Sequence, residues 1–169
     1  PICPAQLVEV LARAVPDGPD QDLDKLRWTL LGAVAQARER IGIVTPYFLP
    51  DAALQNALAV AALRGVTVDV VLPAVNNLRF VQWAQTAELW SLLVRGCRVW
   101  LTPPPFDHTK LMVIDGRWSC VGSANWDPRS LRLNFELAVE CYDEGLAAAL
   151  TERLDARIAK ARRYTREDL

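Results

Sequence analysis

Residues 23–41 carry apolar side chains at intervals of three and four, which is the period of one face of a helix. The apolar positions are Leu23, Leu26, Leu30, Val34, Ala37 and Ile41. This spacing predicts an amphipathic helix that ends near Arg40. A β-branched run at 41–45 follows directly and predicts a short strand, which Pro46 ends.

Helix and strand patterns continue to alternate downstream. Asp51 is suited to cap a second helix, and Gly65 and Gly96 stand where the second and third helices should end. These elements are helices over 52–64 and 78–95 and strands at 66–72 and 97–101. Because strands and helices follow one another in this order, we expect parallel β/α units with right-handed crossovers. The fold class is therefore predicted to be α/β.

The two ends of the chain show different patterns. Residues 1–22 are rich in proline and acid, so we interpret them as a linker-like segment before a domain at 23–169. After a later proline run, the pattern predicts two short strands around Asp115-Gly116 and a further strand at 134–142.

A last helix is indicated by Leu146, Leu150, Leu154 and Ile158, which are four residues apart. The basic run from Arg153 to Arg166 also contains acidic residues, so we interpret it as a solvated helix face. A surface for anionic lipid or phosphate is the alternative interpretation.

Composition narrows the class of protein. The chain has 169 residues, of which 51% are hydrophobic and 23% charged, as expected for one globular domain with a buried core. Nineteen Lys and Arg stand against twenty Asp and Glu, so the net charge is −1 and nucleic acid is not an expected partner. No apolar stretch reaches the roughly 20 residues that span a bilayer, so we expect the segment itself to be soluble.

The cysteines Cys3, Cys97, Cys120 and Cys141 have no metal-ligand spacing. Three of them lie in apolar, strand-like runs, and we interpret these three as buried thiols in a reducing compartment. The chain contains a single histidine, which also disfavours a zinc site and directs attention to His108.

His108 lies in the stretch PFDHTKLMVIDGRWSCVGSANWDPRSLRLNFE. Asp-Gly between two apolar runs predicts a two-residue hairpin turn, with Ile114 and Arg117 as the first cross-strand pair. Counting outward from the turn, the predicted pairs are Lys110 with Val121, His108 with Ser123, and Phe106 with Asn125. Because side chains alternate between faces, all six are expected on one face of the hairpin.

This face would gather the groups that chemistry at a phosphodiester requires. An uncharged imidazole nitrogen of His108 can attack phosphorus and form a phosphohistidine. Lys110 can neutralise the non-bridging oxygens, and Ser123 and Asn125 add hydrogen-bond donors. Glu136 is the candidate to accept from the other ring nitrogen and fix the tautomer. The scheme requires no metal and no cofactor.

Each residue also has a simpler explanation. A lone histidine on a strand is usually structural, and Glu136 by itself would be a partner for an arginine. Asp115 lies an odd number of residues from His108 and Lys110, so its side chain is expected on the opposite face, and it also sits at the turn. We therefore interpret Asp115 as a scaffold residue. The aromatic group of Tyr47, Phe48 and residues 80–90 fits either an entrance for acyl chains or headgroups, or core packing. The joint spacing of the residues is what favours a catalytic site.

The spacing His108-x-Lys110, then Asp115, then Gly122-Ser123-x-Asn125 resembles the HKD signature of the phospholipase D superfamily. The run SANWDPRSLRLNFE, which ends at Glu136, and the segment TPYF at 45–48 are similar to cardiolipin synthases. The resemblance implies a mixed β-sheet flanked by helices on both faces.

The resemblance also implies a role for each matching residue. His108 would be the nucleophile or, in a paired motif, the general acid, with Lys110 and Asn125 on the phosphate, Ser123 in support, Glu136 orienting the histidine and Asp115 as the family aspartate. Asp107 and Trp126 depart from the pattern, because apolar residues, usually smaller at the second position, are familiar there. By alternation, Asp107 should not face the pocket.

The superfamily mechanism uses two HKD motifs, whereas this chain has one. We therefore expect the C-terminal half of a cardiolipin synthase-like parent at the cytoplasmic face of the membrane. That parent would move a phosphatidyl group from a phospholipid such as phosphatidylglycerol to an alcohol. The expected partner is a second HKD half, either the N-terminal half of the same parent or a homodimer mate.

Two other functions remain open. One is a phospholipase D-type hydrolase or nuclease that is active as a homodimer. The other is a catalytically silent half that only binds anionic phospholipid headgroups.

Overall fold

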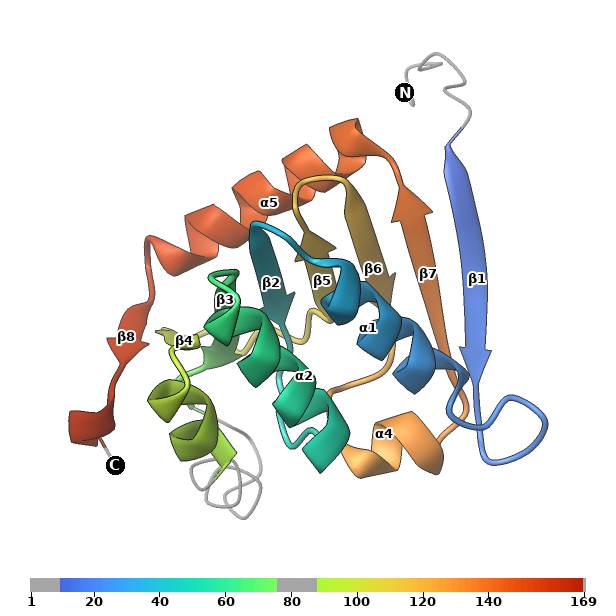
Figure 1. Ribbon diagram of the computed structural model, residues 1–169, viewed down its shortest axis with the longest axis horizontal. Helices are drawn as coiled ribbons and strands as arrows, with labels where there is room; N and C mark the ends of the chain where they lie inside the picture. Colours follow the sequence, from blue (N-terminus) through green and yellow to red (C-terminus); the bar gives the residue numbers. More distant parts are fainter. Residues whose placement is uncertain (1–9, 76–87, 169) are drawn as a thin grey trace.

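The computed structural model describes residues 10–75 and 88–168, which fold around one mixed β-sheet (Figure 1). The strands are β1 (Leu11–Asp17), β2 (Arg40–Val44), β3 (Thr67–Pro73), β4 (Arg98–Thr102), β5 (Leu111–Ile114), β6 (Trp118–Gly122), β7 (Glu136–Tyr142) and β8 (Arg162–Tyr164). The helices are α1 (Lys25–Gln36), α2 (Ala52–Leu63), α4 (Pro128–Arg132) and α5 (Glu144–Ile158), followed by a 3-10 turn at Arg166–Asp168. Residues 88–94 are also helical.

The order of the strands in the sheet is β1-β7-β6-β5-β2-β3-β4-β8. Strands β2, β3 and β4 are parallel to one another, as the alternating pattern predicts. All other neighbouring strands pair antiparallel. The carboxyl ends of the parallel strands therefore meet at the same edge as the start of β5 and the end of β6.

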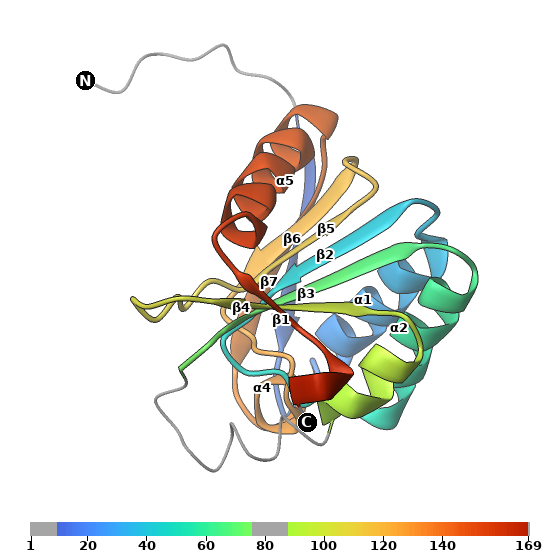
Figure 2. The same cartoon turned by 90° about the vertical axis from the view of Figure 1, so that its left-hand side faces the viewer.

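Helices cover both faces of the sheet (Figure 2). On one face, α1 and α2 bury a large core that includes Ile41, Val68 and Met112. On the other face, α5 packs through Ala147 and Leu154 onto a second apolar cluster. The prediction of an α/β fold with helices on both faces of a mixed sheet is confirmed.

The expected linker at 1–22 is wrong for the residues that form β1. Leu11–Asp17 pairs along its whole length with β7 and forms an edge of the sheet. Asp17 is buried and its carboxylate accepts a hydrogen bond of 3.1 Å from the backbone N–H of Leu26, which joins the strand to α1. The cross-strand pairing with a distant segment therefore overrides the turn-like composition.

The helix predicted to end near Arg40 ends four residues earlier, at Gln36. Ala37 already has an extended conformation, and Arg40 is the first residue of β2. The second helix agrees with prediction, because the Asp51 side chain accepts from the N–H of Leu54 at its N-terminus. The expected helix over 78–95 lies outside the described residues up to position 87.

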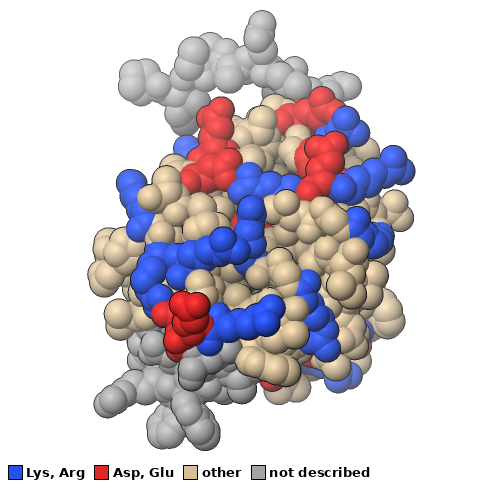
Figure 3. All heavy atoms as spheres, turned by 60° about the vertical axis from the view of Figure 1, so that its left-hand side comes forward, with Lys and Arg blue, Asp and Glu red and all other residues tan. Residues whose placement is uncertain are grey.

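The basic run at the end of the chain is only partly helical. After α5 ends, Arg162–Tyr164 forms edge strand β8, which pairs with β4. Tyr164 is buried, and the guanidinium of Arg163 lies 5.8 Å from the centre of the Trp100 ring. Figure 3 shows basic and acidic side chains together on this side of the molecule, and Arg162 pairs with Asp168.

Three further expectations can be compared with the structure. Cys97 and Cys120 are buried, which raises the pKa of each thiol to about 12, and Cys141 is half-buried, whereas Cys3 lies outside the described residues. Phe48 belongs to the core, where its ring stacks on Trp126 at a centroid distance of 5.8 Å, so core packing explains it. Across residues 10–75 and 88–168, no helix combines the length and the apolar character needed to cross a membrane.

Candidate active site

The turn of the central hairpin forms where the sequence predicts it, but the register differs by one residue. Asp115 and Gly116 both have positive φ angles, of 52° and 62°. Arg117 donates from its N–H to the carbonyl of Ile114 yet is left out of the pairing, so Ile114 pairs with Trp118. The predicted two-residue register is therefore wrong, because one extra residue sits beside the turn.

The shifted register changes which side chains share a face. Leu111, and not Lys110, lies opposite Val121, while the N–H of Gly122 donates to the carbonyl of Lys110. The expectation that six residues share one face of a regular hairpin fails for this reason. His108 lies in the loop between β4 and β5, beyond the paired part of the hairpin.

His108 and Lys110 are nevertheless brought together. The buried Lys110 Nζ lies 3.0 Å from Nδ1 and 3.1 Å from Nε2 of the exposed His108, and donates to the His108 carbonyl at 2.8 Å. Burial lowers the pKa of Lys110, partly offset by the carboxylates of Glu136, Asp107 and Asp127. The ammonium of a buried lysine therefore lies directly beside an exposed imidazole.

Glu136 and Ser123 form a second pair in this region. The Ser123 hydroxyl donates to Glu136 Oε2, and Asn134 Nδ2 donates to Glu136 Oε1 at 3.0 Å. The N–H of Leu137 donates to Ser123 Oγ at 3.1 Å. Within the described part of the chain, Glu136 and His108 share no hydrogen bond.

Asn125 is held by a short helix that the sequence pattern did not reveal. Its Nδ2 donates to Ser130 Oγ at 3.2 Å, whereas its Oδ1 is buried without a hydrogen-bond partner. Asp127 caps this helix, α4, by accepting from the N–H of Ser130 at 2.8 Å, and Pro128 occupies its first turn. Asp-Pro at a helix start was the signal that could have located it.

Asp115 joins the hairpin turn to the segment that leads into β2. Its carboxylate accepts hydrogen bonds of 2.8 Å from the backbone N–H groups of Arg38, Glu39 and Arg40. Burial would raise the pKa of Asp115, but these backbone hydrogen bonds outweigh it and hold the pKa below its usual value. The residue ties the tip of the hairpin to the start of β2, at the opposite end of β5 from His108.

Gly122 is a further residue whose identity the structure explains. A Cβ atom at this position would lie 2.6 Å from the carbonyl oxygen of Leu137 and 2.7 Å from Cα of Ala138. Both atoms belong to the backbone of β7, so β6 and β7 can approach this closely only with glycine here. This approach sets the position of Ser123 beside Glu136.

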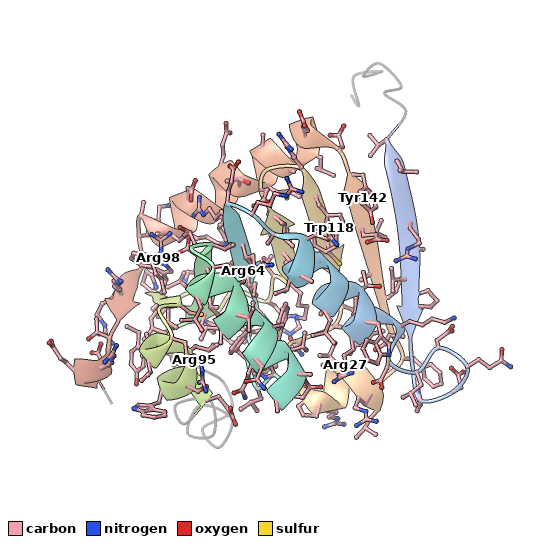
Figure 4. All side chains as sticks on the ribbon, in the orientation of Figure 1. Arg27, Arg64, Arg95, Arg98, Trp118 and Tyr142 are labelled. Carbon is pink, nitrogen blue, oxygen red and sulfur yellow. The ribbon has the colours of Figure 1, made fainter. Side chains whose placement is uncertain are left out.

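A well-formed cavity lies away from these residues. It has a volume of about 880 Å³, lies between α1 and strands β1 and β7, and is lined by Trp28, Trp118 and Tyr142 among others. Figure 4 shows Trp118 and Tyr142 at the end of β6 and β7 remote from α4. A smaller cavity of about 180 Å³ is lined by Phe106, whose ring centre is 6.0 Å from that of His108. We place the site at His108 because that is where the reactive groups meet.

Known proteins resemble this chain in sequence. Residues 30–158 match the family described as cardiolipin synthase, PLD-like domain. The chain is 40% identical over 135 residues to cardiolipin synthase 2 of Staphylococcus epidermidis, covering 80% of this chain and 28% of that protein. It is 35% identical over 154 residues to the major cardiolipin synthase ClsA of Bacillus subtilis, covering 91% and 32%. The chain thus spans about a third of the length of these relatives.

Solved structures agree on the fold. The phospholipase D family member Nuc of Salmonella typhimurium superposes with a TM-score of 0.79 at 23% identity, covering 93% of this chain and 99% of that one. Phosphatidylserine synthase of Haemophilus influenzae superposes with a TM-score of 0.70 at 17% identity, covering 92% and 40%. The chain therefore belongs to the cardiolipin synthase, PLD-like domain family of the phospholipase D superfamily.

Proposed function

We propose that the chain carries one catalytic half of an enzyme that transfers phosphatidyl groups by way of a phosphohistidine on His108. The contact of Lys110 Nζ with both ring nitrogens of the exposed His108 is the observation that supports this most directly. A phosphate diester that replaces solvent there would meet a nucleophile and a positive charge together. The identity of 40% to a cardiolipin synthase supports a phospholipid as the substrate.

The reaction would proceed in two displacements. In the first, a ring nitrogen of His108 forms a bond to phosphorus, the bond to the leaving alcohol breaks, and an acid protonates that alcohol. In the second, the acceptor alcohol gives its proton to a base and forms a bond to phosphorus, and the bond to His108 breaks. Lys110 stabilises the charge on the non-bridging oxygens in both steps.

One histidine cannot serve as the nucleophile and as the acid for the same leaving group. We therefore propose that a second HKD half supplies the acid and base, which commonly contribute about 10²- to 10⁴-fold to a rate. The partner would be the N-terminal half of the same parent protein, because the relatives are about three times longer than this chain. A homodimer mate is the alternative source.

The remaining predicted residues have supporting roles in this proposal. Ser123 and Glu136 act as one unit through their hydrogen bond, and the negative charge of Glu136 acts on Lys110. Orientation of His108 by Glu136 would require one of the two side chains to rotate toward the other. Contact of Asn125 with phosphate would likewise require its Nδ2 to leave Ser130. Phosphatidylglycerol at the cytoplasmic face of the membrane remains the proposed donor and setting.

The test is headgroup release and transfer from short-chain phosphatidylglycerol, with His108→Ala as the control. Transfer to glycerol or to a second lipid supports a transferase, whereas release to water alone by the intact parent protein contradicts it. A rate that rises with the square of chain concentration indicates two copies in one site. Saturable lipid binding without turnover under any pairing would support a silent binding half.

A further inference from the structure

His108 stands between two residues whose side chains both contact Arg157 of α5. Arg157 Nε donates to Asp107 Oδ2 at 2.7 Å, and Arg157 Nη2 donates to Thr109 Oγ1 at 3.2 Å. Asp107 Oδ1 in turn accepts from the N–H of Thr109 at 2.9 Å and from its hydroxyl. One guanidinium therefore joins both chain neighbours of His108.

The loop that carries His108 has no regular backbone pairing before its last residue. Residues 103–110 belong to no helix or strand, and regular pairing in β5 starts only at Leu111. Arg157, by contrast, projects from the last turn of α5, a helix of 15 residues whose Leu154 is buried against the sheet. The contact of Arg157 therefore holds the loop at 103–110 against α5, which is itself packed on the sheet.

The ion pair between Arg157 and Asp107 is expected to persist at neutral pH. The side chains of Arg157 and Asp107 are only 29% and 30% exposed. Burial would raise the pKa of Asp107, but hydrogen bonds from Thr109 and Arg157 outweigh it and hold the pKa below the usual carboxyl value. Every oxygen of the Asp107 carboxylate is engaged, which leaves Arg157 and Thr109 as its partners instead of His108.

We propose that Arg157 is a positioning residue, which clamps Asp107 and Thr109 so that the His108 ring stays beside Lys110. This inference rests on the proposed function of His108. A planar guanidinium reaches two acceptors at a fixed separation, which the single ammonium of lysine cannot do. Displacing a reacting group by about 1 Å can cost on the order of 10²-fold in rate.

The test compares Arg157→Gln, Arg157→Lys and Asp107→Asn with Arg153→Gln. Arg153 lies one turn earlier on α5 and is exposed, so its substitution matches the change in charge without touching the loop. We expect Arg157→Gln to lower kcat about 10- to 100-fold with little change in KM, and Arg157→Lys to recover part of the loss. Arg153→Gln should behave as wild type. The double variant Asp107→Asn, Arg157→Gln should lose no more than the worse single variant.

A second readout does not depend on turnover. The chain has one histidine, so the NMR signals of its ring are unambiguous after labelling. We expect one sharp set of ring signals in wild type and Arg153→Gln, and broadened or multiple sets in Arg157→Gln, with similar unfolding midpoints. Unchanged ring signals in Arg157→Gln would overturn the clamp even in a chain without turnover. The proposal would also be overturned if Arg157→Gln only lowered the amount of folded protein and left kcat per folded molecule unchanged. If the ring signals change in a chain that shows no turnover, the clamp is supported and the proposed function fails.

Discussion

Asp115 offers the sharpest test of the division between scaffold and chemistry in the HKD motif. Its carboxylate satisfies three backbone N–H groups at the junction between α1 and β2. Substitution by alanine leaves all three without this partner. A hydrogen bond to a charged group contributes about 1.5–3 kcal/mol when protected from water, and two of these three are exposed.

Counting the part-buried bond from Arg40 in full and discounting the other two, we expect Asp115→Ala to cost about 3 kcal/mol. For a domain of this size, that corresponds to a fall in Tm of roughly 9 °C. Asp115→Asn keeps one acceptor oxygen and should cost about half as much. Urea and thermal denaturation measure both values. Asp20→Ala removes an exposed carboxylate with one local hydrogen bond and serves as the control.

The contribution of Asp115 to the free energy of unfolding changes with pH in a direction that its lowered pKa determines. Because the folded pKa of Asp115 is lowered, its contribution is present above the usual carboxyl value of 3.8 and is lost as the pH falls through the folded pKa. The difference in unfolding free energy between wild type and Asp115→Ala should therefore shrink in acid. If Asp115→Ala unfolds like wild type yet loses all turnover, Asp115 takes part in the chemistry and the scaffold reasoning is refuted.

Three further substitutions separate chemistry from stability. His108→Ala should abolish headgroup release without moving the unfolding midpoint, because the side chain is exposed, and substantial remaining turnover would remove it as the nucleophile. Gly122→Ala should lower the unfolding free energy by about 1–3 kcal/mol in urea denaturation, because the added methyl group meets the backbone of Leu137, and an unchanged midpoint would contradict the close approach. Asp69→Asn should cost about 2–3 kcal/mol in the same assay, because the fully buried carboxylate holds the part-exposed Arg98, and a loss below about 0.5 kcal/mol would show that the ion pair is unimportant.

The elements that were predictable from sequence are those with local signals. The cap at Asp51 defines the start of α2, and Gly65 adopts the positive φ of 90° that its position after the helix predicts. The parallel strands follow from short β-branched runs between such helices. In these cases, the backbone preference and the burial pattern agree, so neighbouring residues suffice.

The elements that were missed depend on distant partners. β1 contains Pro16 and mostly exposed side chains, so nothing in its own pattern marks a strand, and pairing with β7 creates it. β8 has three residues and is stabilised by β4 and by the buried Tyr164. Such pairings are set by the assembled sheet and leave little trace in local periodicity.

The candidate site was predictable in its residue types and less so in its contacts. The turn at Asp115 and the proximity of His108 to Lys110 followed from spacing. The extra residue at Arg117 shifted the register. The Asp-Gly sequence predicts where the chain turns, but it does not determine which two residues form the first cross-strand pair. The bond between Ser123 and Glu136 required knowledge of the β6–β7 approach, which only the assembled sheet provides.

The anchoring of Asp115 gives the spacing of the motif a geometric meaning. Lys110 borders the start of β5, Asp115 follows its end, and Gly122 closes β6 on the return. The intervals between these residues therefore measure the length of a hairpin that is fastened at its tip and reactive at its base. A residue inserted into β5 would move the side chains on one side of the insertion to the opposite face of the sheet. It would also change the distance between Lys110 and the turn at Asp115. The number of residues between the members of the motif is therefore constrained by the length of the hairpin, as well as by the residue types themselves.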